Sequence, residues 1–597
     1  MKKVVCFIIA VVGYLSSFVV PYFFPPTISV SASYDYGFNN KIGIIIIVVT
    51  SFIVSCISFK QAPSLKDNFF CVERRYDEGF KKVFLWLQIF EVLFCFVIWF
   101  CIGHTYGVSE SGFFLPKLND LFHGRKLYTE IDFPYGALLL YIPMVFYYIM
   151  PFLGLQGSYF LSFTAVNCLG FYLLYKILEK VNLDEKTKIW LLISIFFIAG
   201  RPISAGMNYT LFRFLPPFYF LYKINSNIDK NSILKNIFWL IISSCVVLNI
   251  SPEIGIIYGI TLFLSYSVFA LFNVRQYMLY AIISLLILIS MLWLGFIIGM
   301  FTEVKAFLSG SMNWPFVFSF PMLFFLIQIF ILAYHVGIQL RDIQNNFTLL
   351  SLELMACGMI VCALGRCDPG HLFWNGIFLT IIFAYYGIKY ISKKYVIFSI
   401  LLFPMLTFPY SIIQIGKIYS YALMTHPVIA NVFQTQTGKN LIFSMAKIAG
   451  VNEEKVRNRI QNPNWLIADE LQNIKDVALP LSMISSNLYA YLVNSGKIHY
   501  LPYMDTSFYG SKSVIDRQLQ CLIDEKPKYL IVFKEWEKSA KNVNYKEQIK
   551  SLFMAPYNFK VVNNGNLLYK DTVKYIQQNY DVIADINSVY SILRRKL

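Results

Sequence analysis

The chain has 597 residues, of which 57% are hydrophobic, 18% aromatic and only 14% charged. Soluble proteins average about 45–50% apolar and about 25% charged residues, so this composition excludes an ordinary soluble protein and indicates an integral membrane protein. The formal net charge is +17. Once the spans below are placed, about 20 Lys and Arg residues fall on one side of the membrane and about 7 in the opposite loops, which indicates a topological signal rather than nucleic-acid binding.

Residues 1–82 contain two hydrophobic segments, 4–24 and 42–59, which are long enough to cross a bilayer. The first begins with basic residues, as a signal peptide does, but its apolar run exceeds the usual length of about 7–15 residues and no A-x-A site follows. We therefore expect an uncleaved span. The loop that follows, up to residue 82, holds six Lys and Arg residues, which predicts a cytoplasmic location by the positive-inside rule.

Span 83–102 leads into a polar loop, residues 105–154, which is predicted to lie on the far side of the membrane. The last part of this loop, 137–153, is apolar, but a full crossing there would place the basic cluster after residue 176 outside. We therefore predict a juxtamembrane or re-entrant helix at 137–153. Its Tyr and Phe residues are typical of a membrane interface.

Ten further spans are expected, which brings the total to about 13. They cover residues 158–178, 189–206, 210–225, 237–250, 252–272, 277–300, 316–340, 348–365, 371–391 and 395–415. Prolines at 216, 217 and 252 break some of them, and a broken helix at membrane depth requires a cavity or protein groups that satisfy its freed backbone. Residues 83–415 are expected to form one transmembrane domain.

From about Gly438 onward, no apolar run reaches the roughly 18 residues that a span needs. Residues 416–597 are predicted to form a soluble α/β domain outside the membrane. Helices are expected at 465–474, 487–496 and 512–527, strands at 479–486 and 528–533, and a hairpin at 559–570 around an Asn-Gly pair. The 11 Cys residues form no CxxC motif and no Cys/His cluster, so no metal-ligand set is expected.

Charged groups within or beside membrane spans cost roughly 2.5–3.5 kcal/mol each on insertion scales, so those in this chain require a reason. Four groups of polar residues, all predicted on the far side, are candidates for a functional site. They are Glu110, Asp120, Tyr128, Asp132 and Tyr135 in the long loop, then Arg201 with Arg213, then Glu253, and last Arg366, Asp368 and His371. Their predicted gathering on one face of the membrane favours a functional role.

The long loop contains an amphipathic helix, which would hold Glu110 at its start beside the membrane surface. A carboxylate there could act as a general base toward an acceptor hydroxyl, although scattered charges are also typical of a solvated connection. The arginines either bind phosphate oxygens or extend toward the interface. Glu253 either pairs with such an arginine or caps a helix, and His371 is either a substrate contact or a polar group at a helix start.

Several stretches of the chain carry a resemblance to a known family. The loop sequence ESGFFLPKLNDLFHGRKLYTEIDFPYGALLLY resembles the first external loop of polytopic membrane glycosyltransferases of the GT-C superfold, in which an acidic residue precedes Gly and aromatic residues. Other segments of bacterial members are similar to NISPEIG, ALGRCDPGHL, LYAYLVNSGKIHYLPYMD, EKPKYLIVF and NYDVIADINSVYSILRRK. Together these stretches lie within residues 83–597.

The resemblance implies an inverting glycosyltransferase that moves a sugar from a polyprenyl-phosphate donor to a glycan, lipid or protein acceptor on the far face of the membrane. It implies that Glu110 is the base, at a position where the family usually has Asp, with Asp132 and Asp120 as rivals and Asp35 as a weaker one. The three arginines would stabilise the departing lipid phosphate. The two tyrosines and the later polar residues named above would contact the substrates.

Such an enzyme would need no cofactor for a monophosphate donor, whereas a pyrophosphate donor often requires a divalent metal such as Mg²⁺ or Mn²⁺. We expect the protein in the cytoplasmic membrane of a bacterium, with the site and the C-terminal domain outside. One alternative is a flippase or transporter of lipid-linked saccharides, which predicts internal repeats that this sequence does not show. The others are a polysaccharide polymerase or ligase and a receptor or assembly scaffold.

Overall fold

The computed structural model describes most of the transmembrane part and about half of the C-terminal part. The described residues are 2–26, 33, 37–61, 69–70, 77–103, 110–131, 133–199, 206–228, 231–272, 276–301, 313, 315–390, 392–407, 420, 423–424, 426, 428–429, 435–448, 450–451, 456, 471, 473–480, 486–501, 512–533, 570–586 and 590–596. The expected hairpin at 559–570 lies outside these residues except for Lys570, and of the expected helix at 465–474 only residues 471, 473 and 474 lie within them.

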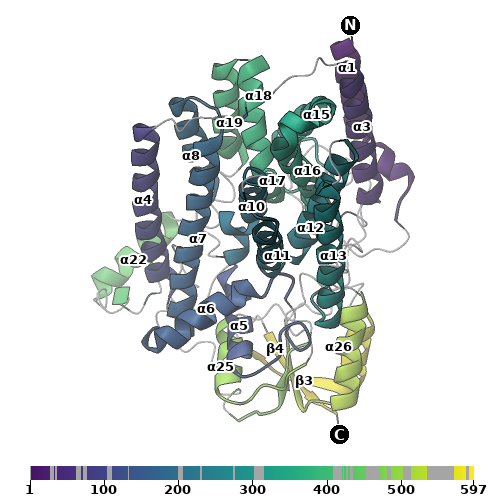
Figure 1. Ribbon diagram of the computed structural model, residues 1–597. Helices are drawn as coiled ribbons and strands as arrows, with labels where there is room; N and C mark the ends of the chain where they lie inside the picture. The colour runs from purple at the N-terminus through teal and green to yellow at the C-terminus, as the bar shows by residue number, and fades with distance from the viewer. Residues whose placement is uncertain are drawn as a thin grey trace.

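A bundle of helices makes up the described part of residues 2–407 (Figure 1). In chain order it contains α1 (Lys2–Ser16), η1 (Val20–Phe23), α3 (Asn40–Gln61), α4 (Glu78–Ile102), α5 (Ser111–Phe122), α6 (Leu138–Ile149), η2 (Pro151–Leu153), α7 (Gly154–Lys180), α8 (Glu185–Ala199), η4 (Met207–Tyr209), α9 (Leu211–Phe214), α10 (Pro216–Asn225), α11 (Ile233–Ile250), α12 (Pro252–Phe272), α13 (Gln276–Ile297), α15 (Phe320–Arg341), α16 (Ile343–Arg366), α17 (Pro369–Asn375), α18 (Ile377–Tyr390) and α19 (Lys393–Thr407). The elements named η are short 3₁₀ helices.

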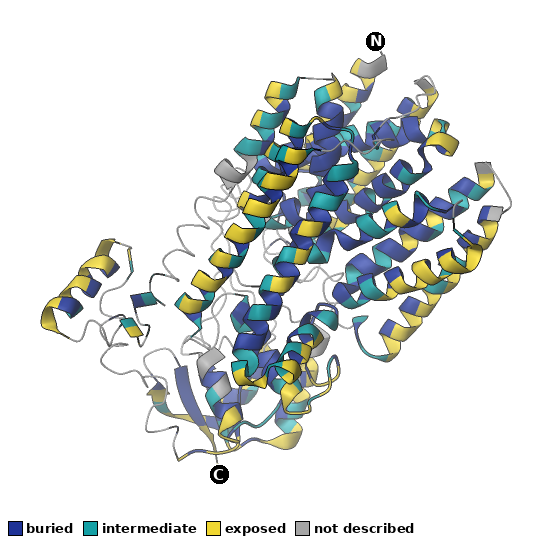
Figure 2. Cartoon of the chain, turned by 60° about the vertical axis from the view of Figure 1, so that its left-hand side comes forward, coloured by how far each residue is buried: buried dark blue, intermediate teal, exposed yellow. Residues whose placement is uncertain are grey.

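Eight of the described helices are long and apolar enough to cross a membrane, namely α3, α4, α7, α11, α12, α13, α15 and α16. Their outward faces carry large apolar side chains that no part of the chain covers, such as Phe52 at 68% and Trp86 at 71% exposure. Figure 2 shows exposed residues along the outer faces of long helices and buried residues between helices. A bilayer solvates such a surface, so the chain is an integral membrane protein.

The other five expected spans coincide with shorter helices. Helices α1, α8 and α19 have 15 residues each, and α18 has 14. The expected span at 210–225 is divided at Leu215 into α9, with four residues, and α10, with ten. The prolines at 216 and 217 start the second helix, because proline suits the first positions of a helix but cannot donate within it.

Helix α6 lies within the segment predicted to be juxtamembrane or re-entrant. It has 12 residues, which corresponds to a length of about 18 Å. A hydrocarbon core is about 30 Å thick, so α6 alone is too short to cross it. Figure 1 shows α6 beside α5 at the lower end of the bundle, and both helices contact α7.

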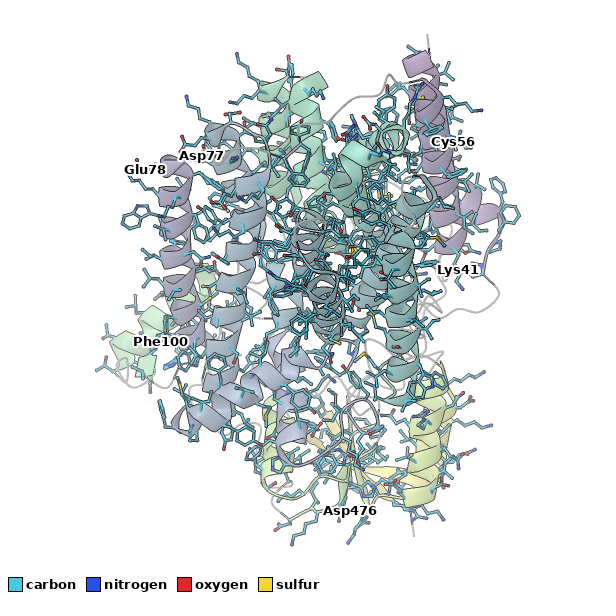
Figure 3. All side chains as sticks on the ribbon, viewed as in Figure 1. Lys41, Cys56, Asp77, Glu78, Phe100 and Asp476 are labelled. Atoms are coloured by element: carbon cyan, nitrogen blue, oxygen red, sulfur yellow. The ribbon has the colours of Figure 1, made fainter. Side chains whose placement is uncertain are left out.

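The two ends of the bundle differ in what they contact. In Figure 3, Asp77 and Glu78 mark the upper end of α4 and Phe100 its lower part, while Asp476 lies in the C-terminal unit below the bundle. At the upper end the buried ammonium group of Lys188 pairs with Asp77 at 2.7 Å, which ties α8 to the start of α4. The lower end carries α5, α6 and the C-terminal sheet (Figure 1).

The C-terminal unit is a four-stranded sheet with helices packed beside it. Its strands are β1 (Val477–Ala478), β2 (Tyr529–Phe533), β3 (Tyr580–Ile586) and β4 (Tyr590–Arg595), and its helices are α25 (Ser486–Asn494), α26 (Lys512–Glu525) and α29 (Lys570–Asn579). The strand order is β1-β2-β4-β3, in which β1 and β2 are parallel and the other pairs antiparallel. A separate helix, α22 (Gln436–Ile448), precedes this unit in the chain.

Several C-terminal predictions are confirmed by these elements. Helices α25 and α26 and strand β2 lie where they were expected, and Gly496, which follows α25, has a positive φ of 63° as a helix stop requires. Of the strand expected at 479–486, residues 481–485 lie outside the described part; the described strand β1 precedes this range, ending at Ala478, and Ser486 begins a helix. The hairpin of β3 and β4 was not predicted.

Candidate functional site

Helix α5 holds Glu110 at the lower end of the bundle. Phe114 and Leu118, four residues apart on one face of α5, are fully buried against a cluster that includes Phe133 and Tyr159. The carbonyl oxygen of Glu110 accepts hydrogen bonds from the backbone of Phe113 and Phe114, so this residue begins the helix. The side chain of Glu110 therefore lies at the N-terminal end of α5.

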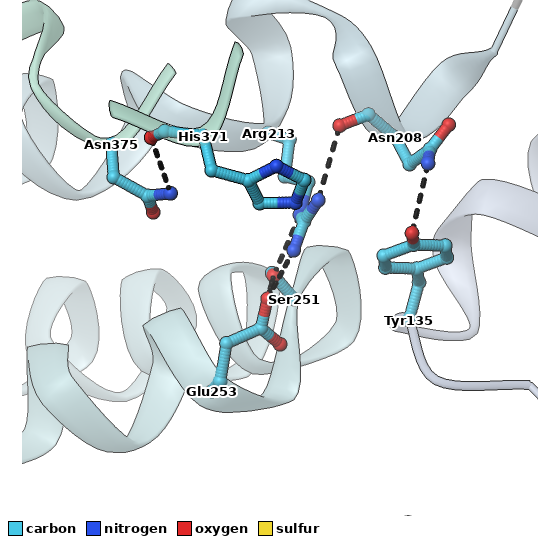
Figure 4. A network of polar contacts seen from close by, with 7 residues as sticks. All are labelled: Tyr135, Asn208, Arg213, Ser251, Glu253, His371 and Asn375. Carbon is cyan, nitrogen blue, oxygen red and sulfur yellow. Dashed lines mark hydrogen bonds and ion pairs between the residues drawn. The ribbon is translucent and has the colours of Figure 1, made fainter. Parts of the chain in front are cut away.

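Asn208 connects Glu110 to the next part of the site. Its side-chain amide donates to the Glu110 carboxylate at 3.2 Å. The same amide donates to the Tyr135 hydroxyl at 2.8 Å, a bond drawn in Figure 4. The close approach of η4 to α5 depends on Gly206, because a Cβ there would lie 2.5 Å from the Cβ of Glu110. Asn208 is fully buried, and its bond to Tyr135 is protected from bulk water.

Arg213, on α9, joins three segments of the chain (Figure 4). Its Nε donates to the Ser251 hydroxyl at 3.0 Å, one terminal nitrogen donates to the Asn208 carbonyl at 3.2 Å, and the other pairs with the Glu253 carboxylate. Ser251 in turn donates to Glu253 at 2.7 Å. The guanidinium also lies 4.6 Å from the centre of the Tyr135 ring, a distance typical of a cation–π interaction.

His371 and Asp368 form a second polar pair near this network. Asp368 caps the start of α17 by accepting from the His371 backbone at 3.0 Å, and its other oxygen lies 2.7 Å from Nδ1 of the His371 ring. The His371 ring contacts the Tyr209 ring edge-on, with 6.0 Å between the ring centres. Tyr209 follows Asn208 directly, so η4 contacts both the network around Arg213 and the Asp368–His371 pair.

The side chains of the network are largely buried, but each of three of them keeps some exposure to solvent. The exposed fraction of the side chain is 11% for Arg213, 27% for Glu253 and 23% for His371. Buried hydrogen bonds fix the orientation of these groups, while the remaining exposure leaves polar atoms within reach of a ligand or of water. Such an arrangement can position a carboxylate, a guanidinium and an imidazole around a polar substrate.

The structure thus brings together most of the described residues that were predicted as a site. Glu110, Tyr135, Arg213 and Glu253 lie in one network, and the Asp368–His371 pair adjoins it. Tyr128 supports the network, because its buried hydroxyl donates to the Tyr135 carbonyl at 2.8 Å. The expected pairing of Glu253 with an arginine is confirmed by its contact with Arg213.

The remaining predicted residues are Asp120, Asp132, Arg201 and Arg366. Asp120 is at the opposite end of α5 from Glu110, where its carboxylate accepts a hydrogen bond from the Tyr489 hydroxyl of the C-terminal unit. Asp132 and Arg201 are outside the described residues, and so is Asp35. Arg366 ends α16, but its side chain is also outside the described part of the structure.

Two neutral residues at the centre of the network, Asn208 and Ser251, were not predicted. The only signal for Asn208 is its place between the two arginines of the GRPISAGMNYTLFR stretch, and Ser251 precedes the proline that starts α12. Among the described residues, no group of three or more His, Cys, Asp or Glu side chains is placed to hold a metal ion. Comparison of the chain with protein-family models, with curated proteins and with solved structures finds no match.

Proposed function

We propose that this protein is a membrane glycosyltransferase that transfers a sugar from a polyprenyl-phosphate donor to the hydroxyl of a glycan, lipid or protein acceptor. The observation that carries the proposal is the network that joins Glu110 to Arg213 through Asn208 and Tyr135. It combines an accessible carboxylate with cationic and aromatic groups in a protein whose helices lie in lipid. Transfer of a sugar from a lipid phosphate to a hydroxyl needs a base for the hydroxyl and positive charge for the phosphate, and this network contains both kinds of group.

In this proposal Glu110 is the general base. Its carboxylate takes the proton of the acceptor hydroxyl as the acceptor oxygen forms a bond to C1 of the sugar. The bond from C1 to the phosphate oxygen breaks, and polyprenyl phosphate leaves with the electron pair, so the configuration at C1 is inverted. The Asn208 amide, 3.2 Å from the Glu110 carboxylate, orients this group.

Arg213 is assigned mainly to positioning. Its guanidinium has five N–H groups, and three of them donate to Ser251, Glu253 and the Asn208 carbonyl. Two N–H groups are therefore left for a phosphate oxygen of the donor, and the paired Glu253 offsets the positive charge. Further charge on the phosphate would be met by Arg201 and Arg366, which the sequence places beside the same elements.

A GT-C-like arrangement of about 13 spans is part of the proposal, with the five shorter helices completing their crossings together with adjacent segments. The lower end in Figure 1, which carries α5 and the C-terminal sheet, would then face away from the cytoplasm. The Lys and Arg residues of the opposite end support this orientation by the positive-inside rule. A bacterial cytoplasmic membrane is the location that the resemblance described above favours.

The test is sugar transfer by the purified protein from a set of synthetic polyprenyl-phosphate sugars, for the wild type, Glu110→Gln and Glu130→Gln. Loss of a general base lowers transfer by about 10²- to 10⁴-fold, which we expect for Glu110→Gln. Glu130→Gln is the matched control, because Glu130 is an exposed carboxylate of the same loop that bonds only locally, to the Lys126 backbone at 2.6 Å.

Two outcomes of this assay separate the alternatives. Equal transfer by the wild type and Glu110→Gln would move the base to another carboxylate, with Asp132→Asn as the next variant. Absence of transfer from every donor, together with movement of lipid-linked saccharide across liposome membranes, would replace the enzyme by a flippase. Repeating the assay in EDTA measures the need for a divalent metal, and we expect transfer from monophosphate donors to continue because arginines can neutralise the phosphate.

A further inference from the structure

Helix α22 has three distinct faces along its 13 residues. One face, formed by Ile442, Phe443 and Ala446, is buried against a small cluster that includes Met424 and Val456. This inner face accounts for only part of the apolar surface of the helix. Among the described residues, the cover of α22 is therefore on one side.

A second face of α22 is apolar and uncovered. Leu441, Met445 and Ile448 recur at positions i, i+4 and i+7, which places them in one stripe on a helix. Their side chains are 50%, 45% and 87% exposed. A stripe of three large apolar residues with this exposure is unfavourable in water.

The third face is polar and exposed. It is formed by Gln436, Asn440, Ser444 and Lys447, which follow each other at intervals of three or four residues and so lie along one side of the helix. A hydrogen bond of 3.2 Å links Gln436 to Asn440 on this face. The polar stripe adjoins the uncovered apolar stripe, as in helices that lie in the plane of a membrane interface.

The position of α22 agrees with a place at the membrane surface. The segment that precedes it contacts the end of α4, where the His426 ring stacks on the Phe100 ring with 4.6 Å between their centres. Phe100 and Phe96 belong to the lipid-facing side of α4, with 48% and 49% exposure. Figure 1 shows α22 beside the bundle near the lower end of α4, above the C-terminal sheet.

We infer that α22 is an interfacial helix whose outer stripe, Leu441, Met445 and Ile448, inserts into the bilayer that the protein itself spans. The segment before α22 is anchored on the exposed side of α4 through His426 and Phe100, and Lys447 on the polar face would meet anionic headgroups. At 13 residues, or about 20 Å, α22 is too short to cross the membrane. It would hold the chain that leads to the C-terminal unit against the membrane surface.

The test uses the full-length protein with a photoreactive benzoyl-phenylalanine in place of one residue at a time, reconstituted in nanodiscs of phosphatidylcholine and phosphatidylglycerol. Leu441, Met445 and Ile448 are the test positions, and Asn440 and Ser444 are controls on the same helix. After irradiation, mass spectrometry measures adducts with phospholipid. An inserted stripe predicts at least about a fivefold higher phospholipid yield at the test positions than at the controls.

Equal yields at apolar and polar positions would overturn the inference. Adducts at the test positions with a second copy of the chain, in place of lipid, would also overturn it and would identify the stripe as a contact between protomers. Because single substitutions at exposed positions leave the inner face of α22 intact, the labelled proteins are expected to fold. Equal thermal unfolding of test and control variants in nanodiscs checks this directly.

Discussion

Arg213 is the residue on which the polar network depends most. Its side chain is only 11% exposed and lies beside Glu253, and both side chains form hydrogen bonds with Ser251. Removing one member of such a pair leaves the other charge without compensation in a medium of low polarity, whereas removing both avoids this penalty. The pair should therefore behave as a unit when it is mutated.

We predict that Arg213→Gln and Glu253→Gln each lower the free energy of unfolding by about 1–3 kcal/mol, since each leaves a polar partner unsatisfied. The double variant should lose less than the sum of the two single losses, because neither charge is then left alone. Thermal unfolding of the four proteins in detergent gives this coupling. Additive losses would show that the two side chains do not stabilise each other.

Glu91 is a second buried carboxyl, on the membrane helix α4. Its Oε1 atom accepts from the Asn167 amide of α7, and the Cys95 thiol lies 3.5 Å from the same oxygen. Its other oxygen has no hydrogen-bond partner among the described residues. An uncompensated charge is costly in such a place, while a neutral group that keeps the Asn167 bond is not.

Glu91→Gln is therefore expected to keep the stability of the protein, since the amide oxygen can still accept from Asn167. Glu91→Ala should lower it by about 1–3 kcal/mol, because the buried Asn167 amide loses its partner. Thermal unfolding distinguishes the two variants. Equal damage from both substitutions would mean that α4 and α7 need a carboxylate charge and not only an acceptor at this position.

At the scale of elements, the loop between α5 and α6 approaches the end of α11 very closely. The amide of Gly136 donates to the Ile250 carbonyl at 3.2 Å, and a Cβ on Gly136 would lie 2.1 Å from the Asn249 carbonyl oxygen. Only glycine permits this backbone contact. The contact places Tyr135 directly over Arg213.

Gly136→Ala should therefore force the loop away from α11 and lower the free energy of unfolding by about 1–3 kcal/mol, as overpacking does. Gly365→Ala is the matched control, because the nearest atom to its added Cβ would be 4.0 Å away and the residue lies in helix α16. We expect the control to be neutral or slightly stabilising. Similar losses in the two variants would contradict the close approach.

Elements with a strong local pattern were predictable from the sequence, and those defined by their partners were not. Helix α26 is amphipathic and is followed by Pro527, and β2 is a short apolar run. Strand β3 lies at the edge of the sheet, and only its first and last residues are buried. It therefore shows no alternation of apolar and polar residues, and its pairing with β4 alone defines it.

The charged residues of the site were predictable from the sequence, because a charge near a membrane costs free energy and therefore calls for a reason. That cost indicated Glu110, Arg213 and Glu253, and the fold brings them together. It could not indicate Asn208 or Ser251, because neutral polar residues are common in loops and helix ends. Their role depends on which side chains become neighbours in the folded chain, and one sequence does not contain that information.

For the molecule as a whole, the contact between α5 and the C-terminal unit links the two parts of the chain. The Tyr489 hydroxyl of α25 donates to Asp120, and the Arg125 guanidinium lies 4.0 Å from the centre of the Tyr500 ring. Burial and the nearby Asp120 carboxylate raise the pKa of Tyr500 to about 12, with Arg125 opposing them. The docked state thus binds the Tyr500 proton more tightly than an exposed tyrosine does.

The pKa of Tyr500 predicts how docking depends on pH. Because the pKa of Tyr500 is raised in the docked state, its protonated hydroxyl contributes to the free energy of docking. This contribution is complete below the ordinary pKa of 10.0 and is lost as the pH rises toward about 12. Hydrogen–deuterium exchange of residues 486–501, corrected for intrinsic rates, should therefore increase over this range. In Tyr500→Phe the increase should be smaller, and an identical pH profile would rule out Tyr500 as the titrating group.

The hydrogen bond between Tyr489 and Asp120 should also fix α5, and through it Glu110 at the other end of the helix. We predict that Tyr489→Phe and Asp120→Ala each speed hydrogen exchange in both α5 and α25, by about tenfold where the bond contributes 1.4 kcal/mol. The double variant should be little worse than either single one, because both remove the same bond.

Asp524→Ala is the control, since Asp524 is an exposed carboxylate of α26 whose side chain bonds, among the described residues, to Gln520 within its own helix. Faster exchange in α25 alone would mean that the C-terminal unit rests on α5 without stabilising it, and Glu110 would then be held by Asn208 and the buried face of α5 only.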